Sequence, residues 1–167
     1  MRTEIPDISI RSTFICGFPG EQTKHFLTLK SFIEKQKLEN VGFFAYSPEE
    51  GTVAALMKER ISEKVTQHRL QKLAKCQQKV VRILNKRHVG KVYEVLIDDF
   101  CELDSKKNLL IYKGRTYFQT PEVDGVVYIE SENELVIGEF YDVAITDFKD
   151  YDLRGAVSYT HLRAHET

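Results

Sequence analysis

The sequence predicts two parts: an α/β segment over residues 1–89 and an all-β segment, a small antiparallel barrel, over residues 90–157. Near the N-terminus a β-branched stretch runs into a glycine turn, and apolar residues then recur at helical spacing. After Gly90 the spacing of apolar residues changes to two, which is typical of short strands. Charge changes at the same place: residues 1–89 hold 16 Lys/Arg and 9 Asp/Glu, whereas residues 90–156 hold 7 and 15, so the net charges are +7 and −8. A shift of this kind indicates a domain boundary near Gly90.

The first segment reads as a βαβ unit. Residues 8–16, ISIRSTFIC, form a predicted buried strand that ends at the turn GFPG. A helix over residues 23–37 and a second strand over residues 41–46 follow, which favours parallel pairing. The apolar face of this helix carries Phe26, Leu29, Phe32 and Ile33. Residues 46–56 are predicted to form a loop because they contain Pro and Gly.

A long amphipathic helix is predicted to start near residue 62. One stripe at helical spacing is traced by Leu70, Leu73, Ala74, Gln77, Val81 and Leu84. The other faces carry Arg69, Lys72, Lys75, Lys79, Arg82 and Lys86. A basic helix can bind nucleic acid, but a charged face of this kind is more often simply solvated, and both interpretations stay open at this point.

Five short strands are predicted in the second segment, within residues 91–98, 108–118, 125–130, 134–147 and 151–157. The spacers between them carry turn residues. Strands of this number and length favour a small barrel related in shape to OB-fold or SH3-like barrels.

The three cysteines, Cys16, Cys76 and Cys101, are far apart and form no CxxC or CxxxCxxC spacing. The chain as given therefore carries no recognisable zinc or iron–sulfur ligand set, and we name no metal ligand in it. It contains no run of about 18 apolar residues and no evident signal peptide. We expect no membrane span and a cytoplasmic location.

The last eleven residues, VSYTHLRAHET, have no clear period. They match at every position the in-frame translation of a common transposon-library adapter. We therefore interpret residues 158–167 as a sequencing-adapter artefact and assign no metal role to His161 and His165.

Four stretches occur in an order that resembles the radical-SAM methylthiotransferases: RSTFICGFPGE (11–21), YSPEEGT (46–52), GRTYFQTPEVDGVVYI (114–129) and DYDLRGAV (150–157). The second and third resemble specifically the RimO type, which modifies a ribosomal protein. The family has an N-terminal domain with its own cluster cysteines, a radical-SAM partial barrel with a CxxxCxxC cluster and a C-terminal TRAM barrel. The resemblance implies that this chain is a C-terminal fragment, made of the last two βα units of the partial barrel and the TRAM domain.

The resemblance also implies the chemistry of the full-length enzyme. S-adenosylmethionine (SAM) and two [4Fe-4S] clusters serve as cofactors, and a 5′-deoxyadenosyl radical abstracts hydrogen from the β-carbon of an aspartate in a small-subunit ribosomal protein. A methylthio group is then delivered to that carbon. Because this chain lacks cysteines at cluster spacing, we expect it to hold no catalytic residue and to be inactive alone.

Cofactor-binding candidates follow from the position of the family's late barrel strands, which line the SAM pocket. They are Arg11, Ser12, Gly17, Phe44 and Tyr46. A glycine in the turn lets the backbone approach the cofactor, and an inward Arg11 would pair with the carboxylate of SAM. Core packing is an equally open interpretation for the aromatic residues.

Substrate-binding candidates are the acidic residues Glu49, Glu50, Glu122, Asp124, Asp150 and Asp152. The expected partner is a basic small-subunit ribosomal protein, because a barrel of net charge −8 attracts basic protein and repels RNA phosphates. RNA binding by this acidic barrel is not expected. Two alternatives stay open: a stand-alone TRAM-type module that binds RNA through its basic helix and protein through its barrel, and a fragment of a tRNA methylthiotransferase.

Overall fold

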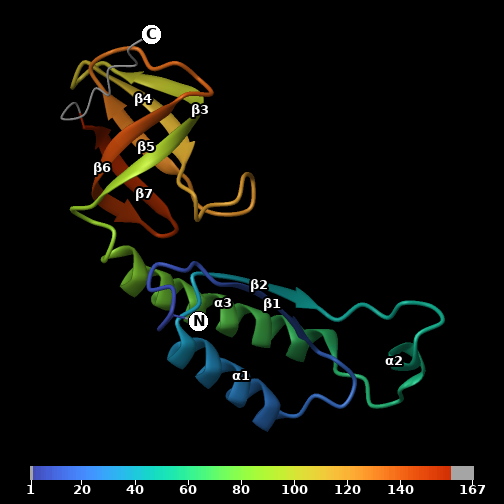
Figure 1. The fold of residues 1–167 in the computed structure, drawn as a ribbon. Coiled ribbons are helices and arrows are strands. Elements are labelled where there is room, and N and C mark those ends of the chain that lie inside the picture. The colour runs from blue at the N-terminus through green and yellow to red at the C-terminus, as the bar shows by residue number, and fades with distance from the viewer. Residues whose placement is uncertain (1, 159–167) are drawn as a thin grey trace. The chain divides into compact units, whose positions relative to one another are not determined.

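The computed structural model describes residues 2–158. The chain divides into two units, one that ends at Val81 and one that begins at Arg82. The first contains β1 (Arg11–Cys16), α1 (Thr23–Gln36), β2 (Asn40–Ala45), α2 (Val53–Leu56) and most of α3 (Glu63–Asn85) (Figure 1). β1 and β2 pair in parallel, with Arg11 opposite Asn40 and Cys16 opposite Ala45, so the predicted βαβ unit is confirmed. Its assignment to a radical-SAM barrel stays a prediction.

The apolar residues of the first unit pack between the two strands and the two longer helices. Ile33 of α1 and Leu73 of α3 are fully buried, and Phe14 of β1 meets Phe32 edge to face with ring centroids 6.0 Å apart. Of the predicted α3 stripe, four side chains are buried: Leu73, Gln77, Val81 and Leu84. Ala74 is exposed, and Arg69, expected on the solvated face, is buried.

The segment predicted as a plain loop holds a short helix, α2. Thr52 is its N-cap: the Thr52 hydroxyl accepts a hydrogen bond from the Ala55 N–H at 3.2 Å and donates one to the Glu49 carbonyl at 2.8 Å. A Thr that bonds its own neighbours in this way can start a helix of one turn without any apolar periodicity in the sequence.

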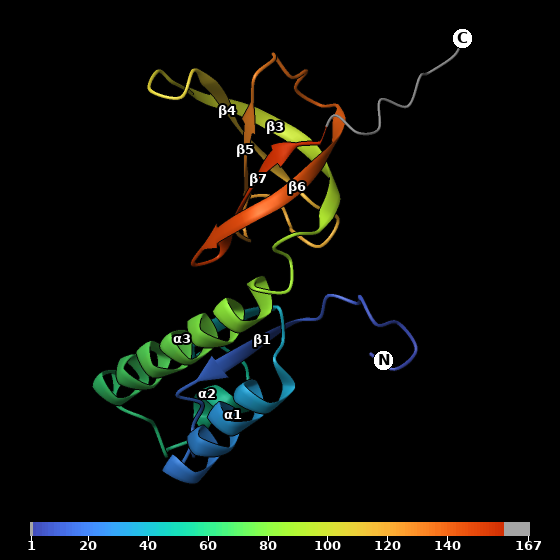
Figure 2. The ribbon, with the colours of Figure 1, turned by 90° about the vertical axis from the view of Figure 1, so that its left-hand side faces the viewer.

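The second unit contains β3 (Val92–Asp104), β4 (Leu109–Arg115), β5 (Val127–Ser131), β6 (Phe140–Lys149) and β7 (Asp152–Val157) (Figure 2). These strands form a closed barrel in the order β3-β4-β5-β7-β6, which confirms the five predicted strands. The expectation of a wholly antiparallel barrel was wrong, because β5 and β7 pair in parallel, with Val127 opposite Leu153. The reason is parity: strands that alternate in direction around a ring of five must leave one parallel pair.

Alternate residues of the strands fill the barrel, as the period of two predicts. The buried core consists of Val95, Ile97, Tyr112, Val127, Ile129, Leu135, Val143, Ile145 and Leu153. The Leu135 N–H donates to the Tyr112 hydroxyl at 3.1 Å, so the one polar group of this core is satisfied. Irregularities in the pairing between Ile97 and Asp99, and between Phe100 and Glu102, fit the sharp curvature that a small barrel requires of β3.

The last turn of α3 belongs structurally with the barrel. The Asn85 side-chain amide donates to the Asp150 carbonyl at 3.1 Å, and the Gly90 N–H donates to the Ile145 carbonyl at 2.8 Å. The second unit therefore begins a few residues before Gly90, where charge and periodicity change in the sequence.

Within residues 2–158, none of the helices is both long and apolar enough to cross a membrane. The segment interpreted as an adapter artefact lies, from residue 159 onward, outside the described residues.

Candidate cofactor-binding site

Three hydrogen bonds fix the turn that follows β1. Their partners are Glu21 just after the turn, Glu59 before α3 and Tyr46 at the end of β2. The Gly17 N–H donates to the Glu21 carboxylate at 2.8 Å, and the Gly20 N–H donates to the Glu59 carbonyl at 2.8 Å. The Tyr46 N–H donates to the Cys16 carbonyl at 2.7 Å, which ties the end of β2 to the end of β1. The carboxyl ends of both parallel strands are thereby fixed at one edge, where α/β proteins place their ligands.

Gly17 is required at this place for two reasons. Its φ of +80° lies in the left-handed region, and a Cβ atom built on it would lie 2.3 Å from the Thr66 hydroxyl oxygen. The turn consequently packs directly on the first turns of α3, with no space for a side chain.

Glu21 and Arg69 form a buried ion pair beneath the turn, with side chains only 12% and 10% exposed. Arg69 also donates to the Glu21 carbonyl at 3.3 Å, and its guanidinium lies 5.8 Å from the ring centroid of Phe26. Sequence reasoning missed Glu21 and misplaced Arg69, because periodicity does not show that a helix cation faces a carboxylate 48 residues earlier. The sequence feature that could have indicated this ion pair is Glu21, an acidic residue directly after the GFPG turn.

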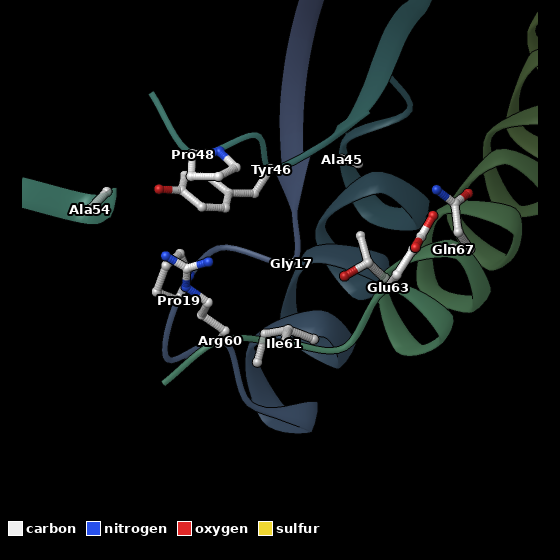
Figure 3. A pocket seen from close by; sticks show the side chains of 11 residues that line it. Gly17, Pro19, Ala45, Tyr46, Pro48, Ala54, Arg60, Ile61, Glu63 and Gln67 are labelled. Carbon is white, nitrogen blue, oxygen red and sulfur yellow. The ribbon is translucent and has the colours of Figure 1, made fainter. Parts of the chain in front are cut away.

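A cavity of about 310 Å³ opens at this edge. Its wall is formed by Gly17, Pro19, Ala45, Tyr46, Pro48, Ala54, Arg60, Ile61, Glu63, Thr66 and Gln67. Figure 3 shows Tyr46, Pro48 and Arg60 on one side of the Gly17 turn, and Glu63 and Gln67 on the other. Aromatic, amide, carboxylate and guanidinium groups thus surround one space beside the Gly17 turn.

The hydroxyl of Tyr46 is buried and has no hydrogen-bond partner among the described residues. A buried polar group without a partner costs stability, and such groups in native proteins call for an explanation. Because Tyr46 lines the cavity, a ligand bound there supplies a partner once the atoms that cover the hydroxyl move. The donors and acceptors of the wall suit a polar nucleoside.

Of the predicted cofactor-binding residues, Gly17 and Tyr46 line the cavity, and Arg11, Ser12 and Phe44 do not. Arg11 begins β1 and the cavity lies beyond its other end, so about 16 Å of extended strand separates them. Phe44 is 60% exposed on β2. The inward Arg11 that would pair with the carboxylate of SAM is therefore not supported by this geometry, and a cofactor role for these three residues stays a prediction.

The thiol of Cys16 lies buried beneath the same edge. Burial raises its pKa above the ordinary value, the Glu21 carboxylate raises it further, and Arg69 lowers it. Such a thiol stays protonated and unreactive at neutral pH. Among residues 2–158, no three His, Cys, Asp or Glu side chains gather closely enough to hold a metal ion.

The predicted substrate-binding acids fall into two groups. Glu49 and Glu50 are exposed in the loop that leads from β2 to α2, just after cavity residues Tyr46 and Pro48. In the barrel, a Cβ atom built on Gly125 would lie 2.1 Å from the Tyr151 carbonyl, so the PEVDG turn packs against the start of β7. The four barrel acids therefore gather at one end.

Two of these four barrel acids also hold the backbone. The Asp124 carboxylate accepts from the Thr120 N–H at 2.7 Å, and the Asp152 carboxylate accepts from the Val126 N–H at 2.9 Å. Asp150 lies 4.0 Å from Arg82, whereas Glu122 is exposed. A role of these residues in substrate binding stays a prediction, and for Asp124 and Asp152 it would have to coexist with their structural hydrogen bonds.

Known proteins match this chain over nearly its whole length. Residues 89–157 match the TRAM domain family. A ribosomal protein uS12 methylthiotransferase RimO from Carboxydothermus hydrogenoformans is 43% identical over 155 residues, which cover 93% of this chain and 34% of the relative. This chain belongs to the RimO methylthiotransferase family.

The RimO proteins of Clostridium kluyveri and Clostridium botulinum give the same result, with 43% and 40% identity over 157 residues and 94% of this chain. The chain spans about a third of the length of the curated relatives it matches. The resemblance inferred from four short motifs is thus confirmed over nearly the whole chain, and the second unit is a TRAM domain.

Proposed function

We propose that this chain contributes a wall of the SAM site and the TRAM domain to a radical-SAM methylthiotransferase. The enzyme would place a methylthio group on the β-carbon of an aspartate in ribosomal protein uS12, in the cytoplasm. The observation that carries the proposal is the 43% identity, over 93% of this chain, to relatives named as uS12 methylthiotransferases.

The cavity at the ends of β1 and β2 supports a role in SAM binding. Gly17 would contribute backbone atoms to the wall of the cofactor site, and Tyr46 would offer its otherwise unpartnered hydroxyl. Glu63 and Gln67, at the start of α3, add carboxylate and amide groups of the kind that bind ribose hydroxyls and amino groups. When bound, SAM and two [4Fe-4S] clusters supply the radical and sulfur chemistry. The residues of this chain position the cofactor and exclude water from it.

The charge of the TRAM domain favours a protein substrate over tRNA. Residues 90–156 carry a net charge of −8, which weakens contacts to phosphates and favours a basic protein. The acids best placed to contact such a partner are exposed: Glu122 of this domain, and Glu49 and Glu50 of the loop before α2. None of the three forms an ion pair among residues 2–158.

A chimera tests the proposal. Residues 2–157 replace the matching segment of the Clostridium kluyveri relative, and the purified protein, loaded with iron and sulfide under anaerobic conditions, is given SAM, reductant and either uS12 or bulk tRNA. We expect mass spectrometry to find a methylthio group on an aspartate of uS12 and none on tRNA. Modification of tRNA instead, or none by a folded and cluster-loaded chimera whose parent is active, would contradict the proposal.

A further inference from the structure

The outward face of α3 carries a row of basic residues that the candidate cofactor site does not use. Within the first unit these are the lysines Lys64, Lys72, Lys75 and Lys79, with His68 between them, all exposed, and we name the five the cationic stripe. Their spacing of four, four, three and four residues keeps them within a sector of about 80°, because successive helix residues turn by about 100°. The stripe is about 22 Å long and lies on the opposite side of the helix from buried Leu73.

This charge is not neutralised locally. α3 contains no acidic residue after Glu63, and none of the ion pairs found among residues 2–158 involves a lysine of the stripe. Glu34 of α1, which faces α3 beside Cys76, is paired with Lys30 at 3.4 Å. Like charges three or four residues apart destabilise a helix, and no acidic residue of α3 after Glu63 offsets that repulsion. The stripe therefore favours a polyanionic partner.

A groove adjoins the stripe. It has a volume of about 710 Å³, lies between α1 and α3, and has Phe26 and Val65 in its wall beside Lys64, His68 and Lys72 of the stripe. Proteins bind single-stranded nucleic acid through a similar combination, in which bases stack on aromatic side chains and phosphates contact Lys or Arg. In this groove Phe26 is largely covered, at 8% exposed, so Val65, at 40% exposed, provides the accessible apolar surface.

We propose that the cationic stripe binds the phosphate backbone of single-stranded RNA and that the adjoining groove receives an unpaired base. One cation per helical turn, about 5.4 Å, suits contacts to successive phosphates on one strand. The two units then bind partners of opposite charge: α3 binds RNA, and the acidic barrel binds basic protein. If the proposed function holds, the enzyme meets its ribosomal protein on RNA rather than free in solution.

The test uses the whole chain and a fluorescein-labelled 20-nucleotide oligouridylate, with fluorescence anisotropy read between 50 and 200 mM salt. Four lysine contacts predict a slope of log affinity against log salt of about −3, which is a loss of about 50-fold over this range. The triple variant Lys72→Gln/Lys75→Gln/Lys79→Gln should make the salt dependence shallower, with a slope of about −1. The matched control Lys35→Gln/Lys91→Gln/Lys106→Gln removes the same charge from exposed positions outside the stripe and should leave the slope unchanged.

Three results would overturn the inference: no binding at 50 mM salt, equal weakening by the stripe variant and the control, or equal competition by polyglutamate of the same charge. The acidic barrel of a second copy of this chain is another possible partner of the stripe. Sedimentation at low salt tests for such a dimer. A dimer that the stripe variant abolishes, without RNA binding by the wild type, would assign the stripe to self-association. None of these readings involves methylthiolation, so failure of this inference is distinguishable from failure of the proposed function.

Discussion

Glu21 and Arg69 are joined beneath the glycine turn by a buried ion pair in which both carboxylate oxygens are used. One oxygen meets Arg69 of α3, and the other accepts the Gly17 N–H at 2.8 Å. The same carboxylate therefore fixes the turn after β1 and attaches that turn to α3. The cavity wall depends on this connection, because Gly17 and Thr66 both belong to it.

Substitution Glu21→Gln should lower the free energy of unfolding by about 3 kcal/mol. The amide keeps the shape of the side chain but leaves the buried guanidinium of Arg69 without a counter-charge. Urea denaturation measures the loss, and Glu49→Gln, at an exposed position, serves as the control with a change below about 0.5 kcal/mol. Equal effects of the two variants would show that the pair is solvated in solution.

Substitution Gly17→Ala should cost about 3 kcal/mol, because it adds a clash with Thr66 to the strain of a positive φ. Gly51→Ala is a matched control: its φ is also +80°, but nothing lies within 4 Å of the added Cβ, so it should cost only about 1 kcal/mol. Thermal unfolding of both variants checks this difference. Indistinguishable losses would mean that Thr66 moves aside freely and that the turn does not depend on close packing against α3.

Substitution Tyr46→Phe should stabilise the ligand-free chain by about 1 kcal/mol, since it removes a buried hydroxyl that has no partner among the described residues. In the cluster-loaded chimera the same change should weaken SAM binding, measured by calorimetry. Tyr128→Phe, on the outer face of β5, should alter neither quantity. A destabilised Tyr46→Phe chain would indicate that the hydroxyl already has a partner within the protein.

Stability should fall at alkaline pH. Burial is the main cause that raises the pKa of the Cys16 and Tyr151 side chains in the folded chain. The folded state therefore holds these protons longer than the unfolded state, so their contribution is fully present below about pH 9 and is lost as the pH rises through the folded pKa values. Urea denaturation between pH 8 and 10.5 should show this decline, with a shallower slope for Cys16→Ala. An unchanged slope in that variant would remove Cys16 as a cause.

The sequence was sufficient to predict elements whose periodicity is local. The βαβ order, the long helix and the five barrel strands are all present, because each buries residues at its own spacing. Features set by distant partners were missed. The parallel pairing of β5 with β7 follows from closure of the ring, and the burial of Arg69 follows from Glu21, 48 residues away. Helix α2 depends on hydrogen bonds of Thr52 rather than on an apolar stripe.

In the candidate site too, residues marked by a local motif were predicted, and residues brought in from distant segments were not. Gly17 and Tyr46 were identified from motifs at the ends of strands, and the structure places both in the cavity wall. Arg60, Glu63 and Gln67 were not identified, because they reach the cavity only through the return of the chain after α2. Strand alternation alone did not distinguish Arg11, at the start of β1, from residues near its carboxyl end.

Hydrogen–deuterium exchange of the cluster-loaded chimera, with and without SAM, tests most directly that the cavity at the ends of β1 and β2 is the cofactor site. We expect SAM to slow exchange in residues 17–20, 45–48 and 60–67, and to leave the barrel strands of residues 92–157 unchanged. Methylthiolation of uS12 without any change in these three segments would contradict the account.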